Sequence, residues 1–183
     1  MFRVKGKSIN YQWLANKVTT FRLLLGLPIL LCLNNDKILI GWLFILIGGF
    51  SDWLDGWLAR RSTTKSNWGA QVDPLADKVM ILVPMLWLLK QNILPLWSIW
   101  ILISRELIVT AWRRNNSDGA PASYAAKLKT SLQFLSIILL LSPTHILGTN
   151  FGLILTQIGL TLFYLSILMS FISAYNYLNN RVN

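Results

Sequence analysis

Residues 52–77 read DWLDGWLARRSTTKSNWGAQVDPLAD, which places four carboxylates, those of Asp52, Asp55, Asp73 and Asp77, in an otherwise apolar region. The chain of 183 residues has only seven Asp and Glu, so four of the seven lie in this stretch. Charged side chains are costly inside a membrane, and those found there usually serve a function. The spacings of three and four residues put each Asp pair on one face of a helix.

Two such pairs facing each other supply the oxygen ligands that hard divalent cations prefer. Without a cation, four neighbouring carboxylates would repel one another and become protonated. The only His and Cys of the chain are His145 and Cys32, which argues against a zinc site. The sequence therefore predicts Mg²⁺ or Mn²⁺ as cofactor, with two ions at one site.

The composition predicts an all-α, polytopic membrane protein. Hydrophobic residues make up 54% of the chain and charged residues 13%. About 20 apolar residues are needed to cross a bilayer. Six segments are long enough to do so, which predicts six transmembrane helices in a single domain over 1–183, with an interfacial helix within 1–17. The expected spans lie near 18–34, 37–59, 73–90, 94–114, 128–147 and 152–176.

The basic residues predict the orientation of these spans. Of the 17 Lys and Arg, all but Lys37 and Lys90 lie on one side of the membrane in this arrangement. The positive-inside rule then places both termini, the 60–72 loop and the 115–127 loop in the cytoplasm, with the Asp cluster opening there. The net charge of +10 is explained by this rule and by anionic lipid headgroups, and no nucleic acid is expected as partner.

The dipoles at two helix ends are expected to favour the charged groups of the site. Asp52 and Asp55 should lie in the last turns of the second span, where the helix dipole attracts cations. Asp73 and Asp77 should open the third span, after a turn at residues 67–69. The dipole there favours an ionised carboxylate or a bound phosphate.

The spacing D-x2-D-G-x2-A-R-x8-G-x3-D-x3-D, met here in full, resembles the signature of the CDP-alcohol phosphatidyltransferase family. Two further stretches resemble its phosphatidylglycerophosphate synthase branch: residues 16–22 with Pro28, and residues 103–113. The resemblance implies transfer of a phosphatidyl group from CDP-diacylglycerol, with release of CMP. It further implies a homodimer and, in a bacterium, the cell (inner) membrane.

The resemblance also implies residue roles. We expect Asp52, Asp55 and Asp73 to be the main metal ligands and Asp77 to contact the second metal, and the resemblance implies that Asp77 is the general base. Contacts to CDP-diacylglycerol are implied for Asn16, Thr19, Gly56, Ala59, Arg60, Ser66 and Gly69. Some of these have plain structural alternatives: Asn16 and Thr19 can cap the first helix, and Gly56 and Ala59 can serve close helix packing.

The remaining cations indicate the acceptor alcohol. We expect Arg105, Arg113, Lys127 and Lys129 to form an acceptor site, because several converging cations favour an anionic alcohol such as glycerol 3-phosphate. Membrane topology alone explains Arg113, Lys127 and Lys129 equally well. An inositol phosphate, serine or phosphatidylglycerol acceptor would keep the same motif. An alternative from another functional class is a divalent-cation transporter. The acids gather at one membrane face beside Arg60, which argues against a transporter.

Overall fold

A computed structural model describes the backbone of residues 11–61, 67–115, 124–142 and 149–179, and the side chains of 17–53, 75–111, 124–142 and 150–175. Within this part the chain is helical and contains no strand. The helices are α1 (Tyr11–Asn34), α2 (Ile38–Arg61), α3 (Asn67–Lys90), α4 (Leu96–Asn115), α5 (Tyr124–Leu140) and α7 (Thr149–Asn179). The all-α prediction is confirmed for the described residues.

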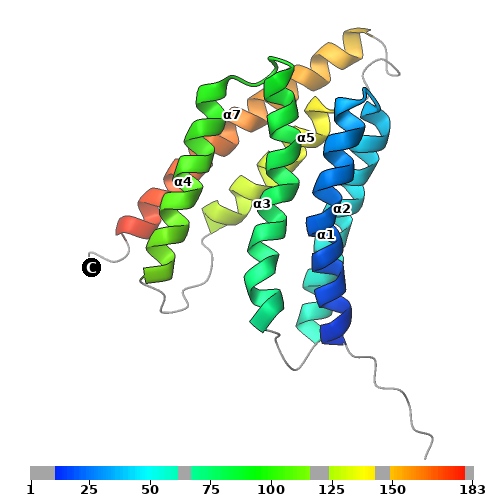
Figure 1. Cartoon of the computed structure of the whole chain (residues 1–183). Coiled ribbons are helices and arrows are strands. Elements are labelled where there is room, and N and C mark those ends of the chain that lie inside the picture. The colour runs from blue at the N-terminus through cyan, green and yellow to red at the C-terminus, as the bar shows by residue number, and fades with distance from the viewer. Residues whose placement is uncertain (1–10, 62–66, 116–123, 143–148, 180–183) are drawn as a thin grey trace, which may run out of the picture.

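Successive helices run in opposite directions (Figure 1). The start of α1, the end of α2, the start of α3, the end of α4 and the start of α5 therefore lie at the same end of the molecule (Figure 1). We call this the motif end, because the stretch 52–77 joins α2 to α3 there. α1 packs on α2 and α3, α5 packs on α7 and α3, and α4 packs on α7.

Small residues let the helices approach closely. A Cβ atom added at Gly48 would overlap the side chain of Met80 on α3, and one added at Gly49 would overlap the ring of Phe134 on α5. Glycine is favoured at helix interfaces because it allows such close approach. The buried core continues along α1 and α3 through Ile29, Leu33 and Leu88 and their neighbours.

The outer surface of the bundle is strongly apolar. Leu27 on α1, Trp100 on α4 and Leu153 on α7 are each more than half exposed, with many other large apolar side chains. By length and composition two stretches of the described helices could cross a membrane, Lys17–Asn34 and Asn150–Tyr175, and Ile38–Trp53 is a shorter apolar helix. These features agree with a membrane protein, whereas six spans stay a prediction.

Several helix ends differ from the sequence prediction. Helix α1 runs without interruption from Tyr11, so the part of the expected interfacial segment after residue 10 forms its first turns, and residues 1–10 lie outside the described part. Helix α5 ends at Leu140 and not near 147. Leu141 and Ser142 follow, and Ser142 precedes Pro143; a residue before proline is disfavoured in the helical conformation.

The expected turn at 67–69 is wrong, because these residues form the first turn of α3. Asp77 consequently lies ten residues inside α3, and Asp52 lies nine residues before the end of α2. Since the helix dipole acts within the terminal turn, it does not provide the assistance expected for these two carboxylates.

Candidate active site

Two acids of the motif, Asp52 on α2 and Asp77 on α3, meet at one cation, Arg22 of α1. The Nη1 atom of Arg22 lies 2.9 Å from Oδ1 of Asp52. The same Nη1 donates a hydrogen bond to Oδ1 of Asp77. The Arg22 side chain is 2% exposed, whereas those of Asp52 and Asp77 are 63% and 47% exposed. The carboxylates thus face a buried cation on one side and are accessible from the other.

The structure brings together part of the predicted metal site. The backbones of Asp55 and Asp73 follow the helical register of α2 and α3 near the motif end, but their side chains lie outside the described residues. Among the described side chains there is no group of three or more Asp, Glu, His or Cys suited to a metal. Asp52 and Asp77 converge on one guanidinium, so two of the four acids of the motif lie close to the same cation.

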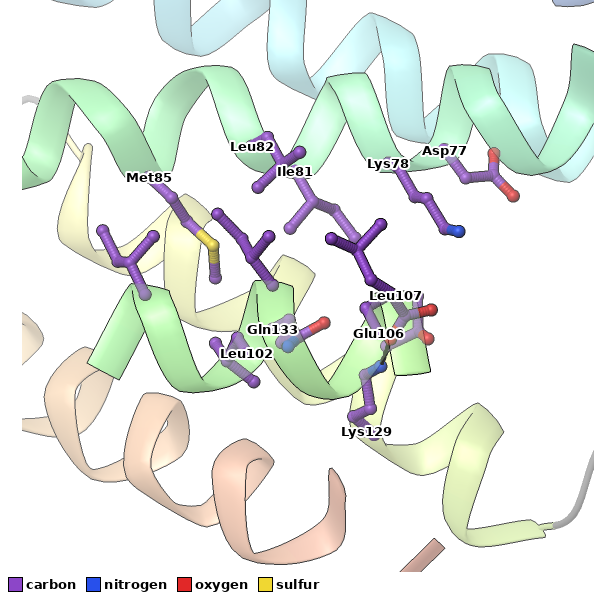
Figure 2. A pocket seen from close by; sticks show the side chains of 13 residues that line it. Asp77, Lys78, Ile81, Leu82, Met85, Leu102, Glu106, Leu107, Lys129 and Gln133 are labelled. Atoms are coloured by element: carbon purple, nitrogen blue, oxygen red, sulfur yellow. Dashed lines mark hydrogen bonds and ion pairs between the residues drawn. The ribbon is translucent and has the colours of Figure 1, made fainter. Parts of the chain in front are cut away.

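A cavity of about 260 Å³ opens beside Asp77, between α3, α4 and α5. Figure 2 shows its two ends. At the polar end, Asp77 and Lys78 of α3 lie across from Glu106 and Lys129. Toward Met85 the lining is apolar, and the amide of Gln133 lies beside Leu102. We call this space the α3–α4–α5 cavity.

Charged residues from two helices form the far wall of its polar end. Lys129 of α5 donates a hydrogen bond to Oε2 of Glu106 on α4. Arg105 Nη1 lies 3.3 Å from the same oxygen. Arg105 and Lys129 are buried, and Glu106 is partly exposed. Two cations and one carboxylate leave an excess of positive charge, which attracts an anionic group.

A second, more polar hollow of about 410 Å³ adjoins this cluster, between α4, α5 and α7. We call it the α4–α5–α7 pocket. Arg105, Glu106, Lys127 and Lys129 all line it, and Glu106 and Lys129 line the α3–α4–α5 cavity as well. The Glu106–Lys129 pair therefore stands where the two spaces meet. Three of the four cations predicted to bind the acceptor are gathered here.

The two lysines differ in their surroundings, a difference that the sequence did not predict. Lys129 is buried, whereas Lys127, two residues earlier on α5, is exposed. Two residues correspond to about 200° around a helix, so the two side chains leave α5 in different directions, although both line the α4–α5–α7 pocket. The fourth predicted cation, Arg113, belongs to α4, but its side chain lies outside the described residues.

Of the residues predicted to contact CDP-diacylglycerol, only Thr19 has a described side chain. It is 1% exposed on α1 and precedes Arg22 by one turn. The side chains of the other six lie outside the described part. Asn16 lies on α1, Gly56, Ala59 and Arg60 on α2, and Gly69 on α3, while Ser66 falls in the undescribed segment 62–66.

Sequence reasoning gave no role to two residues that organise this region. Both belong to stretches that resemble the phosphatidylglycerophosphate synthase branch, Arg22 to residues 16–22 and Glu106 to residues 103–113. The available signal was the same for both: an ionisable residue within a predicted span usually faces the protein interior and has a partner. The partner itself lies on another helix, 55 residues away for the Arg22–Asp77 bond and 23 for the Lys129–Glu106 bond.

Comparison with known proteins decides the family. Residues 12–172 match the family model described as CDP-alcohol phosphatidyltransferase. That match covers most of the chain. This protein belongs to the CDP-alcohol phosphatidyltransferase family.

Several relatives of this chain are named CDP-diacylglycerol--glycerol-3-phosphate 3-phosphatidyltransferase. The protein of Pectobacterium atrosepticum is 31% identical over 147 residues, which cover 75% of each chain. The protein of Sodalis glossinidius is 30% identical over 148 residues, covering 74% of this chain and 75% of the relative. The match to the protein of Bacillus subtilis, at 32% identity over 106 residues, spans 56% of this chain and 55% of that protein. Family membership makes this CDP-alcohol phosphatidyltransferase an enzyme of the transferase class.

Proposed function

We propose that this enzyme transfers a phosphatidyl group from CDP-diacylglycerol to glycerol 3-phosphate, forming phosphatidylglycerophosphate and CMP. The observation that carries this proposal is the arrangement of the α3–α4–α5 cavity. A carboxylate, Asp77, and an ammonium, Lys129, line one polar end of the same cavity from different helices. An acceptor held there by its phosphate can present a hydroxyl to a base. The names of the relatives support the same donor and acceptor.

In the proposed reaction the acceptor hydroxyl attacks the phosphorus that carries the diacylglycerol. The new P–O bond forms as the bond to the CMP phosphate breaks, and the hydroxyl proton passes to a carboxylate oxygen of Asp77. CMP leaves with the electron pair of the broken bond. Direct transfer of this kind needs no covalent enzyme intermediate, in contrast to nucleophilic catalysis by Ser or Cys.

Asp52, Asp55, Asp73 and Asp77 would hold Mg²⁺ or Mn²⁺, two ions in our proposal. When bound, such ions neutralise charge on the diphosphate and on the leaving group. The support from this chain is the convergence of Asp52 and Asp77 on one cation, together with the all-oxygen ligand set of the motif.

Arg105 and Lys129 would bind the phosphate of the acceptor, with Lys127 and Arg113 contributing positive charge nearby. Burial strengthens such contacts, because charges interact more strongly where water is excluded. Asn16, Thr19, Gly56, Ala59, Arg60, Ser66 and Gly69 would contact the donor. The apolar end of the cavity is compatible with a lipid substrate at this site.

We further propose that the six helices span the membrane, with both termini and the motif end in the cytoplasm. The apolar outer surface and the distribution of Lys and Arg support this arrangement. In a bacterium the membrane would be the inner one. The working form would be a homodimer, as the family resemblance implies.

The test is an assay of the purified, lipid-reconstituted protein with CDP-diacylglycerol and Mg²⁺ or Mn²⁺. Glycerol 3-phosphate, an inositol phosphate, serine and phosphatidylglycerol are supplied separately. CMP release and the lipid product are measured. Phosphatidylglycerophosphate formed with glycerol 3-phosphate alone is the expected result. Turnover with another acceptor would overturn the acceptor assignment, and equal rates with and without EDTA would overturn the metal requirement.

A further inference from the structure

One guanidinium connects three helices at the motif end. Arg22 belongs to α1, and its Nη1 contacts Asp52 of α2 and Asp77 of α3. Its side chain is 2% exposed, so the charge is almost completely withdrawn from solvent. A buried charge is tolerated only when it is paired and hydrogen-bonded, so the position of Arg22 is tied to these carboxylates.

Both carboxylates keep an accessible side away from Arg22. Nη1 lies near Oδ1 of each acid, and a carboxylate has a second oxygen that can accept further bonds. Both acids are about half exposed or more, whereas Arg22 is buried, so the guanidinium approaches from the protein side and leaves the opposite side accessible. An arginine behind two metal-binding carboxylates would act like the hydrogen-bonding groups that fix the orientation of metal ligands.

We propose that Arg22 is a positioning residue for the divalent-ion site. It sets the separation and orientation of the carboxylates of Asp52 and Asp77, so that both are prepared to bind a cation. This inference rests on the proposed metal-dependent function. Both carboxylates contact the same nitrogen, Nη1, whose two hydrogens have fixed directions in the planar, always charged guanidinium, so the two acceptors are held at a defined separation.

A second polar link between α1 and α3 provides a matched control. At the other end of the same two helices, Lys90 Nζ lies 2.5 Å from Oδ1 of Asn34. This contact joins α1 to α3 as the Arg22–Asp77 contact does, but it is exposed and distant from the motif along both helices. Its removal tests whether any loosening of α1 from α3 affects the site.

The experiment measures Mn²⁺ binding to the detergent-purified full chain, by electron paramagnetic resonance of the free ion. The unaltered protein is compared with Arg22→Gln, Arg22→Lys and Asn34→Ala, and thermal unfolding is recorded for each without metal. Arg22→Gln is expected to raise the Kd for Mn²⁺ about 10- to 100-fold, the usual effect of removing a group that orients a metal ligand. Arg22→Lys, which restores the charge, should recover part of the affinity. Asn34→Ala should leave the Kd unchanged.

Each other outcome is decisive. An unchanged Kd in folded Arg22→Gln would show that the contact only packs α1, and a lower Kd would show that Arg22 competes with the ion; either result overturns the proposal. If Arg22→Gln does not fold, Arg22→Lys decides the proposal. It must bind Mn²⁺ more weakly than the unaltered protein, and an equal affinity would overturn the proposal. Absence of Mn²⁺ binding by the unaltered protein would instead overturn the metal-dependent function, and this inference with it.

Discussion

Lys129 on α5 donates a hydrogen bond to Glu106 on α4, at the point where the α3–α4–α5 cavity meets the α4–α5–α7 pocket. The pair connects the space beside Asp77 with the space lined by Arg105 and Lys127. A phosphate that binds at this boundary would accept hydrogen bonds from Lys129 while the rest of the molecule extends toward Asp77. The acceptor site in our proposal is therefore centred on this pair.

The two lysines of α5 allow a matched test of that site. Lys129→Ala is expected to raise the KM for glycerol 3-phosphate roughly 10- to 100-fold, because hydrogen bonds to charged groups contribute about 1.5–3 kcal/mol. Lys127→Ala removes the same charge from an exposed position and should change the KM by about twofold or less. Initial rates measured at varied glycerol 3-phosphate concentration and saturating CDP-diacylglycerol give the KM of each variant. Equal effects of the two substitutions would mean that general positive charge, and not a bound phosphate, is responsible.

Glu106→Gln tests the electrostatic coupling of Glu106 to Lys129. Gln keeps the size of the side chain but removes its charge, so the buried Lys129 loses its anionic partner. We expect the free energy of unfolding to fall by about 1–3 kcal/mol. Denaturant-induced unfolding, with the same detergent for every variant, measures this free energy.

A double-mutant cycle with Lys129→Met provides the control for that measurement. The double variant should be less destabilised than the sum of the single variants, since neither charge is then left unpaired. Strict additivity would contradict a direct interaction between the two side chains.

Asp77→Asn should lower kcat about 10²- to 10⁴-fold, the usual contribution of a general base. Donor binding should be largely retained, because Asn occupies the same volume. Single-turnover release of CMP from labelled donor measures the chemical step, and equilibrium binding measures donor affinity. Asp36→Asn is the control, since Asp36 lies in the α1–α2 connection at the opposite end from the motif. Retention of most activity by Asp77→Asn would exclude Asp77 as the base.

Gly159→Val tests the packing of α5 on α7. A Cβ at Gly159 would lie 2.9 Å from Cγ of Leu140 and 3.3 Å from its backbone nitrogen. The Ser136 hydroxyl also donates a 2.8 Å hydrogen bond to the carbonyl of Gly159. Overpacking of this kind costs about 1–3 kcal/mol, so the Tm should fall. Ile158→Val, at an exposed neighbouring position, should leave the Tm nearly unchanged.

The helical class and the family followed from local patterns in the sequence. The spacing from Asp52 to Asp55, and from Asp73 to Asp77, is meaningful without tertiary structure because helix geometry alone places residues three or four apart on one face. The apolar segments were recognisable for a similar reason, since segment length and composition indicate a possible membrane span. Helix ends were less predictable, as α3 and α5 show, because they depend on capping and on neighbouring helices.

Contacts between helices were decided by the tertiary structure. The sequence contained Arg22 and Glu106, but not the information that Arg22 meets Asp52 and Asp77, or that Glu106 meets Lys129. Nor did it distinguish buried Lys129 from exposed Lys127. By itself the sequence determined the helices, the family and the four acids of its motif, all of which depend on residues close together in the chain. Only the tertiary structure decided which charges face one another, because that depends on how distant helices pack.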